Sequence, residues 1–341
     1  MKTSLLQKKN LSSWLSLALL AGSIGFLSAD LPKQEPVVVG KGKHRYSWIQ
    51  DWLKLPEGMK LGNTHGSIVV DKKGRVLVNT DAAHAVVILD ADGNYLKSWG
   101  KEFQGGLHGM CLFEEDGQER LLLAHIGRHE VIKTDLDGKV LRRWGYPEES
   151  GHYANAGEYR PTAVAVAPDG SFFVADGYGK SWVHQYDSEG NYQKSFGGPG
   201  TEPGKMRTPH GLWLDTRRNP PVLLVADREN HRLQYFSLDG EYKGLVGEHF
   251  RRPCGTYQHG TEMVVADLAG RVTLLDSKDQ LIAHLGDQPD PKLRARNGIP
   301  RDLWKDGFFL APHSAAFDQN GNLYVMDWLS LGRISKLKRL H

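Results

Sequence analysis

A segment that recurs along the chain is the feature that most constrains its fold. The run DADGNYLKSWG at residues 90–100 returns as DLDGKVLRRWG at 135–145 and as DSEGNYQKSFG at 187–197. Weaker copies end at Gly247 and Gly286, so the closing glycines are 45, 52, 50 and 39 residues apart. A period of this length is typical of arrays in which each repeat is one small structural unit that packs against its neighbours.

Each repeat has the pattern of four short strands. A first strand, such as residues 66–70, is followed by an Asp/Gly turn, and a second strand ends in Val-Ala-Asp, as at 174–176. A third strand alternates apolar residues, and an Asp-Gly turn precedes the fourth. Four-stranded units of this length stack radially as the blades of a β-propeller. Five units are complete, and a sixth begins near Pro312 and ends without its outer strand.

The missing outer strand has a candidate at the other end of the chain. Residues 43–52 share the basic and aromatic character of the fourth strands. If this segment pairs with the last blade, strands from both ends of the chain close the ring and leave no open sheet edge. We therefore predict an all-β, six-bladed propeller that is closed by an N-terminal strand in its last blade.

The first 29 residues have a different character. Lys2, Lys8 and Lys9 precede an apolar run at 11–26, and Leu-Ser-Ala at 27–29 offers small residues for cleavage. We predict a secretory signal peptide at 1–29, the propeller at 30–341 and export to the periplasm or the extracellular space without stable membrane insertion. The remaining chain has 40 basic and 40 acidic residues, which gives no electrostatic reason to bind nucleic acid. We expect a monomer, and nothing in the sequence indicates that its two cysteines pair.

Histidine recurs at one position of the repeat, just before the first strand. First strands are innermost in a propeller, so residues at this position should encircle one mouth of the central channel. Imidazole and thiolate are good ligands for divalent transition metals. The alternative interpretation is that these side chains only pack. The six positions, called the ring positions below, are His65, His108, Thr162, His210, Cys254 and His313.

Four stretches resemble one known family: RPTAVAV at 160–166, VADGY at 174–178, PHGL at 209–212 and VADREN at 225–230. The chain resembles NHL-repeat propellers, and among them peptidyl-α-hydroxyglycine α-amidating lyase. The resemblance implies a catalytic Zn²⁺, or another divalent transition metal, held by His108, His210 and His313, which are 102 and 103 residues apart. Three histidines leave a fourth zinc position open, as a catalytic site requires. The resemblance also implies that Tyr178 is the base and that Arg228 assists it.

Three positions depart from the family pattern. Asp81 stands near the place of a substrate-binding Arg, Ala311 replaces a Met, and Ser314 replaces an Asp that is a Ca²⁺ ligand in the family. Ca²⁺ is therefore a second candidate cofactor, although the chain lacks the side chain that binds it in the family. A carboxylate on the substrate would need another cation, and the candidates are Arg128, Arg228 and the basic residues of the connection 287–311. We expect that connection to lie at the histidine-bearing mouth.

Two ring positions lie outside the predicted three-His set. Cys254 is a candidate metal ligand or a small apolar filler. His65 is a candidate to bind a second metal, to orient a substrate or to act as an acid or base. The leading functional hypothesis is a metal-dependent carbon–nitrogen lyase that acts on a peptide or small-molecule substrate. The alternatives are a non-catalytic NHL propeller that binds a protein or a glycan, and a metalloenzyme of different chemistry on the same scaffold.

Overall fold

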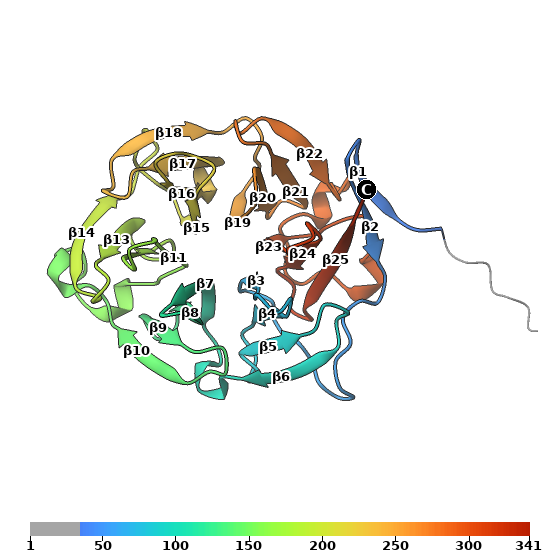
Figure 1. Cartoon of the computed structure of the whole chain (residues 1–341), viewed down its shortest axis with the longest axis horizontal. Coiled ribbons are helices and arrows are strands. Elements are labelled where there is room, and N and C mark those ends of the chain that lie inside the picture. Colours follow the sequence, from blue (N-terminus) through green and yellow to red (C-terminus); the bar gives the residue numbers. More distant parts are fainter. Residues whose placement is uncertain (1–34) are drawn as a thin grey trace, which may run out of the picture. The chain divides into compact units, whose positions relative to one another are not determined.

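The computed structural model describes residues 35–341, so the predicted signal peptide lies outside the described residues. Residues 36–341 form six antiparallel blades around a central channel (Figure 1). The fold prediction is confirmed, including the absence of long helices from the described residues, whose helical segments are single 3₁₀ turns. None of these segments has the length and apolarity that a membrane-crossing helix needs.

The first three blades follow the chain in order, each from its innermost to its outermost strand. Blade one contains β3 (Ile68–Val70), β4 (Val76–Asn79), β5 (Val86–Leu89) and β6 (Tyr95–Trp99). Blade two contains β7 (Leu107–Glu115), β8 (Gln118–His125), β9 (Glu130–Thr134) and β10 (Val140–Trp144). Blade three contains β11 (Ala163–Val166), β12 (Phe172–Ala175), β13 (Trp182–Tyr186) and β14 (Tyr192–Gly197).

The last three blades include the one that joins the two ends of the ring. Blade four contains β15 (Pro209–Asp215), β16 (Val222–Asp227), β17 (Arg232–Phe236) and β18 (Tyr242–Val246). Blade five contains β19 (Pro253–His259), β20 (Glu262–Asp267), β21 (Arg271–Leu275) and β22 (Leu281–Leu285). Blade six contains β23 (Pro312–Phe317), β24 (Leu323–Asp327), β25 (Arg333–Leu340), β2 (His44–Ile49) and β1 (Val38–Lys41).

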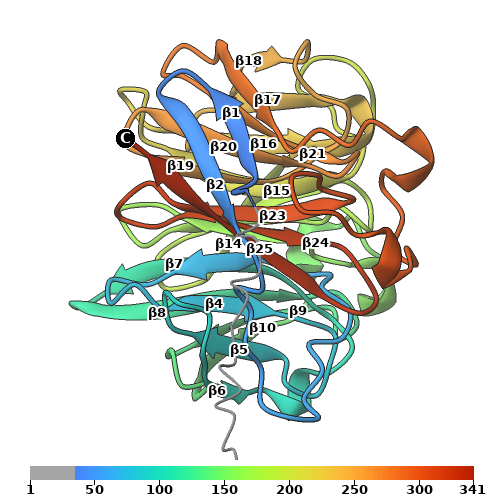
Figure 2. The same ribbon diagram turned by 90° about the vertical axis from the view of Figure 1, so that its right-hand side faces the viewer.

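The ring closes as predicted, with one strand more than expected. β2 pairs antiparallel with β25, and Trp48 of β2 lies opposite Leu337. Trp48 also packs on Phe309, with ring centroids 4.7 Å apart. β1, which the repeat did not predict, adds a fifth strand along the outer edge of β2. Figure 2 shows this hairpin beside the C-terminal strand.

The repeated Trp-Gly ending of the fourth strands joins neighbouring blades. The indole nitrogen of Trp144 donates a hydrogen bond to the carbonyl oxygen of Gly190, in the Asp-x-x-Gly turn of the next blade (2.9 Å). Trp99 donates to the corresponding turn of blade two, there to the carbonyl oxygen of Leu136 (3.1 Å), and its ring packs on the turn glycine Gly138. The turn glycine and the tryptophan thus form one inter-blade contact, which explains why both recur in the repeat.

The aspartate that ends the second strand of several blades fixes the ring position of the same blade. The buried carboxylate of Asp327 accepts hydrogen bonds from the backbone amides of Leu310 (2.9 Å) and Ala311 (2.7 Å). Ala311 is two residues before His313, so the contact holds the chain where it enters β23. The same contact recurs from Asp176 to the amide of Arg160 and from Asp267 to the amide of Arg252.

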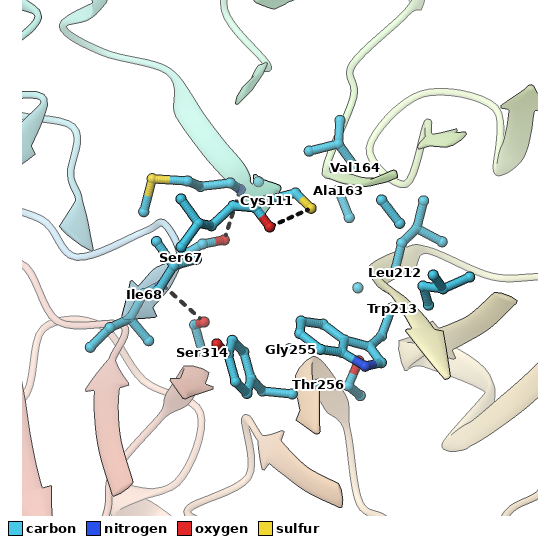
Figure 3. Close-up of a pocket in the computed structure, with 18 of the residues that line it drawn as sticks. Ser67, Ile68, Cys111, Ala163, Val164, Leu212, Trp213, Gly255, Thr256 and Ser314 are labelled. Atoms are coloured by element: carbon cyan, nitrogen blue, oxygen red, sulfur yellow. Dashed lines mark hydrogen bonds between the residues drawn. The ribbon is translucent and has the colours of Figure 1, made fainter. Parts of the chain in front are cut away.

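The innermost strands line a cavity of about 380 Å³ in the central channel. Its wall is largely apolar, and Figure 3 shows Cys111, Trp213 and Thr256 around it. The hydroxyl of Ser314, which stands where the family has a Ca²⁺ ligand, accepts a hydrogen bond from the backbone amide of Ile68 (3.2 Å). Ser314 therefore links blade six to blade one directly.

Candidate metal centre

The structure brings the three predicted histidines together at one end of this channel. His108, His210 and His313 are the second residues of β7, β15 and β23, on alternate blades. Their ring centroids are 4.7 Å (108–210), 4.9 Å (108–313) and 4.7 Å (210–313) apart. All three side chains are almost completely buried. The convergence expected from the repeat is therefore present.

Two of these rings are oriented as metal ligands are. The Nδ1 of His108 lies 2.6 Å from the carbonyl oxygen of Thr162, and the Nδ1 of His313 lies 2.8 Å from that of Gly66. Their Nε2 atoms are buried and have no hydrogen-bond partner within residues 35–341. Burial holds the pKa of both imidazoles well below the ordinary value, so both are neutral near pH 7. Anchored Nδ1 atoms and bare Nε2 lone pairs fit a bound metal ion.

The ring of His65 lies directly beside those of His108 and His313. Ligand atoms of His65, His108 and His313 all lie within 4.8 Å of one another, so this three-His cluster can hold a metal ion. The ring of His65 is 4.7 Å from that of His108 and 5.0 Å from that of His313. His210 is equally near by ring centroids, 4.7 Å from both His108 and His313. The distances between ligand atoms nevertheless place His65, and not His210, in the group that meets the 4.8 Å limit.

Tyr178 and Arg228 stand beside the histidines, as the resemblance implies. The hydroxyl oxygen of Tyr178 is 3.0 Å from His210 Nε2 and 3.1 Å from His65 Nε2, and it accepts from Arg228 Nη1 at 3.3 Å. We expected Arg228 to lower the pKa of this phenol. Burial outweighs that effect and raises the pKa of Tyr178 above its ordinary value, while Arg228 acts in the opposite direction. In the metal-free site the phenol is therefore protonated near pH 7.

Cys254 is completely buried and packs with Leu268 and Ala311. Burial raises the pKa of its thiol to about 11, although Arg228 acts to lower it. A protonated thiol among apolar side chains matches the interpretation of Cys254 as an apolar filler. Cys254 and Cys111 are both free. Ala311, at the place of the family's Met, belongs to the same apolar cluster.

Three of the basic residues proposed as substitutes for the missing Arg, namely Arg128, Arg294 and Arg296, contact groups other than the ring histidines. Arg128 contacts Glu102, Glu130 and the ring of Phe103. In the connection 287–311, Arg294 and Arg296 donate to carbonyl oxygens of their own loop. The connection does reach the mouth, because Asn297 donates to Asn63, two residues before His65 (2.8 Å). The loop was placed correctly, but the contacts of its arginines give no support for a role as a carboxylate anchor.

Asn63 and Trp328 lie at the site and were not predicted from the sequence. Asp81 accepts a hydrogen bond from Asn63 (2.6 Å), and its Oδ2 lies 3.9 Å from the Nδ1 of His65. Trp328 lies 5.6 Å from His65, measured between ring centroids. Trp328 directly follows Asp327, as Arg228 follows Asp227, so the alignment of the second-strand endings could have found it. No such pattern marks Asn63.

Curated sequences similar to the chain include several amidating enzymes. Peptidyl-glycine alpha-amidating monooxygenase B of Xenopus laevis is 26% identical over 336 residues, which are 93% of this chain and 34% of that protein. A probable peptidyl-alpha-hydroxyglycine alpha-amidating lyase of Caenorhabditis elegans is 39% identical over 92 residues, 26% of this chain and 24% of that one. The chain is distantly homologous to amidating lyases.

The similarity to these relatives covers only part of their length. Peptidyl-alpha-hydroxyglycine alpha-amidating lyase 2 of Drosophila melanogaster is 30% identical over 173 residues, 49% of this chain and 39% of the relative. The chain thus matches between 24% and 39% of the length of these three curated relatives. No protein-family model matches the chain.

Solved structures show the same propeller fold. A streptogramin B lyase superposes with a TM-score of 0.56 at 13% identity, over 82% of this chain and 96% of that one. A putative gluconolactonase superposes with a TM-score of 0.55 at 17% identity, over 83% of this chain and 93% of the other. At these identities the likeness is one of fold alone. It does not indicate which residues of this chain form a functional site.

Proposed function

We propose that the chain is a metal-dependent carbon–nitrogen lyase of the peptidyl-α-hydroxyglycine amidating type. One observation carries the proposal. A single phenol, Tyr178, lies within hydrogen-bond distance of two imidazoles and one guanidinium, next to buried imidazole nitrogens without partners. A base, a cation and a metal-binding set thus meet at one point, as the cleavage of a carbinolamide requires.

The proposed metal ligands are His108, His210 and His313. A bound Zn²⁺, or another divalent transition metal, would polarise the substrate hydroxyl and make its proton easier to remove. Anchoring to backbone carbonyls holds the rings of His108 and His313 in one tautomer, with Nε2 toward the metal. The buried surroundings strengthen every electrostatic interaction at this point.

Tyr178 would remove the proton from the substrate hydroxyl. The carbon–oxygen double bond forms as the carbon–nitrogen bond breaks, and the nitrogen takes up one proton. The products are a primary amide and a glyoxylate-type aldehyde acid, so atoms balance and no oxidant is needed. Arg228, whose side chain is 11% exposed, would stabilise the phenolate and stand beside the substrate carboxylate.

Asp81 supports a second candidate, which is the same bond cleavage on a substrate without a carboxylate. Its carboxyl lies at the mouth beside His65, in the region where the family pattern has a positive charge. Burial raises the pKa of Asp81, against the hydrogen bond from Asn63 that lowers it. An ionised Asp81 would repel a substrate carboxylate, and a protonated Asp81 would not provide the positive charge that binds one. We also propose that the enzyme is exported, on the basis of the basic and apolar character of residues 1–29.

The test uses the purified full chain and a peptide that ends in α-hydroxyglycine. We expect about one metal ion per chain and release of glyoxylate, both lost in His108→Ala. The matched control is His84→Ala, because His84 is an exposed histidine of blade one that contacts Ser98 and lies outside the ring positions. A wild-type chain without metal would contradict the proposal. Metal binding without glyoxylate release, and with cleavage of uncharged carbinolamides, would favour the second candidate.

A further inference from the structure

We propose that His65 is a fourth imidazole ligand of the metal, which would take the substrate hydroxyl in a fifth position, and that Asp81 is the outer-sphere carboxylate partner of His65. This inference rests on the metal site of the proposed function and deepens it. His65 shares with His108 and His313 the one group of nearby ligand atoms that could hold a metal among the described residues, all within 4.8 Å.

The rings of His65, His108 and His313 share one orientation. In His108 and His313, Nδ1 faces a carbonyl oxygen and Nε2 faces inward without a partner. In His65, Nδ1 lies 3.9 Å from the Oδ2 of Asp81, and Nε2 points inward to Tyr178. A carboxylate on the far nitrogen of a ligating imidazole is a common outer partner in metal sites, where it fixes the tautomer and the ring orientation.

The centre of the site has fewer protons than inward-facing acceptor atoms. Tyr178 has one hydroxyl proton but faces the Nε2 atoms of both His65 and His210, while Arg228 already donates to its oxygen. A phenol proton can satisfy only one of the two imidazoles. With the bare Nε2 atoms of His108 and His313, three inward lone pairs then lack a proton when each ring carries its proton on Nδ1. Buried lone pairs facing one another are costly unless a cation lies between them.

Asp81 is itself held in place by two successive hydrogen bonds. Its Oδ2 accepts from Asn63 Nδ2 at 2.6 Å, and Asn63 Oδ1 accepts from Asn297 Nδ2 at 2.8 Å. The chain of contacts runs from the connection 287–311 to the ring of His65. A loop from blade six therefore positions the carboxylate that orients a blade-one histidine. Four nitrogen donors suit transition metals such as zinc, iron, nickel or copper rather than calcium or magnesium.

The experiment uses Co²⁺ as the probe on the purified full chain and does not depend on activity. We would measure the affinity by chelator competition and the coordination by the visible absorption of bound Co²⁺. In His65→Ala we expect affinity to fall by about 100-fold or more and the absorption bands to shift, because loss of an outer partner alone typically costs about 10- to 100-fold. For Asp81→Asn, a second variant of nearly equal volume, we expect about a 10- to 100-fold loss.

The controls separate this inference from the proposed function. His84→Ala should bind Co²⁺ like the wild type, and thermal unfolding of the metal-free variants checks that each one folds. If His65→Ala and Asp81→Asn keep the wild-type affinity and spectrum while His108→Ala loses both, His65 only orients Tyr178 and the inference is wrong, whereas the metal site stands. If the wild type binds no Co²⁺, the inference and the proposed function fail together.

Discussion

Tyr178 is the residue whose surroundings are hardest to explain without a reaction. Its hydroxyl has three polar neighbours, His65, His210 and Arg228, although burial keeps it protonated in the metal-free site. For Tyr178→Phe we predict a fall in turnover of about 100-fold or more, since a positioned acid or base contributes about 10² to 10⁴. Metal content should stay at the wild-type level. Steady-state kinetics and metal analysis on one preparation check both.

The matched control for this substitution is Tyr192→Phe. It removes a hydroxyl from the outer strand of the same blade, where Tyr192 contacts Ser195 (2.7 Å). Turnover should be unchanged in this variant. Equal losses in both variants would mean that blade three is merely destabilised, and wild-type turnover in Tyr178→Phe would remove the tyrosine from the reaction.

The positions of site residues were predictable from the sequence where those residues recur in the repeat. Their tautomers and pKa values depend on contacts between blades, which the sequence does not give. The three alternate-blade histidines share one repeat position, so alignment alone predicted that they converge. The tautomer of His313 depends on the carbonyl oxygen of Gly66, which is 247 residues away and belongs to blade one. The net rise in the pKa of Tyr178 likewise depends on the depth of burial, which a list of neighbouring charges does not give.

Among the secondary-structure elements, the Asp-x-x-Gly turns do more than reverse the chain. Gly190 has a φ of +75°, and a Cβ built on it would lie 2.4 Å from the indole nitrogen of Trp144 in the preceding blade. For Gly190→Ala we predict a loss of about 2–4 kcal/mol in the free energy of unfolding, from left-handed strain and overpacking. Urea unfolding followed by tryptophan fluorescence measures it.

Gly145→Ala is the control for this turn. Among the described residues, no atom beyond the two chain neighbours lies within 4 Å of a Cβ built on Gly145, and the φ of Gly145 is outside the left-handed region. The change in unfolding free energy should therefore stay within about 0.5 kcal/mol. If the two substitutions had equal effects, the inter-blade contact would not be what makes the turn glycine necessary.

The strands were predictable from the sequence because each one recurs. The four-strand pattern places a first strand at 66–70, where β3 spans Ile68–Val70, and the end of a second strand at 174–176, where β12 ends at Ala175. β1 is the exception, since residues 38–41 have no copy elsewhere in the repeat and pair only with β2. A strand that is defined by its partner, and not by its own pattern, is not visible to repeat alignment.

For the whole ring, closure through both ends of the chain makes folding depend on contacts of long range. β2 pairs with β25 across almost the full length of the described chain. Arg333 lies over the ring of Trp48 (5.2 Å to its centroid), so the joint combines strand pairing with aromatic packing. The six blades therefore form one closed ring. We expect a buried charge that destabilises one blade to lower the free energy of unfolding of the whole domain.

Buried histidines outside the metal centre set how that stability depends on pH. His125 and His184 are completely or almost completely buried. Burial lowers the pKa of His125 to about 4 and that of His184 to about 3. The unfolded chain protonates both near 6.5. Their contribution to stability is therefore full above about pH 6.5 and is lost as the pH falls toward the folded values.

We predict that the metal-free protein loses stability between pH 7 and pH 5. At pH 5 the two histidines together cost up to about 4 kcal/mol, because each unfolded imidazole gains a proton that the folded one refuses. Asp176 acts in the opposite direction, since burial raises its pKa to about 6 and its protonated form favours the fold at low pH. Asp81 and Asp327 act like Asp176, because burial raises their pKa too. The buried imidazoles of His65, His108, His210 and His313 act like His125 and His184, so the net effect is a loss. Urea unfolding at pH 5, 6 and 7 measures the slope, and His184→Gln, which cannot titrate, should reduce it. Stability that rises toward pH 5 would show that the carboxyls dominate and that the histidines are hydrated in the folded protein.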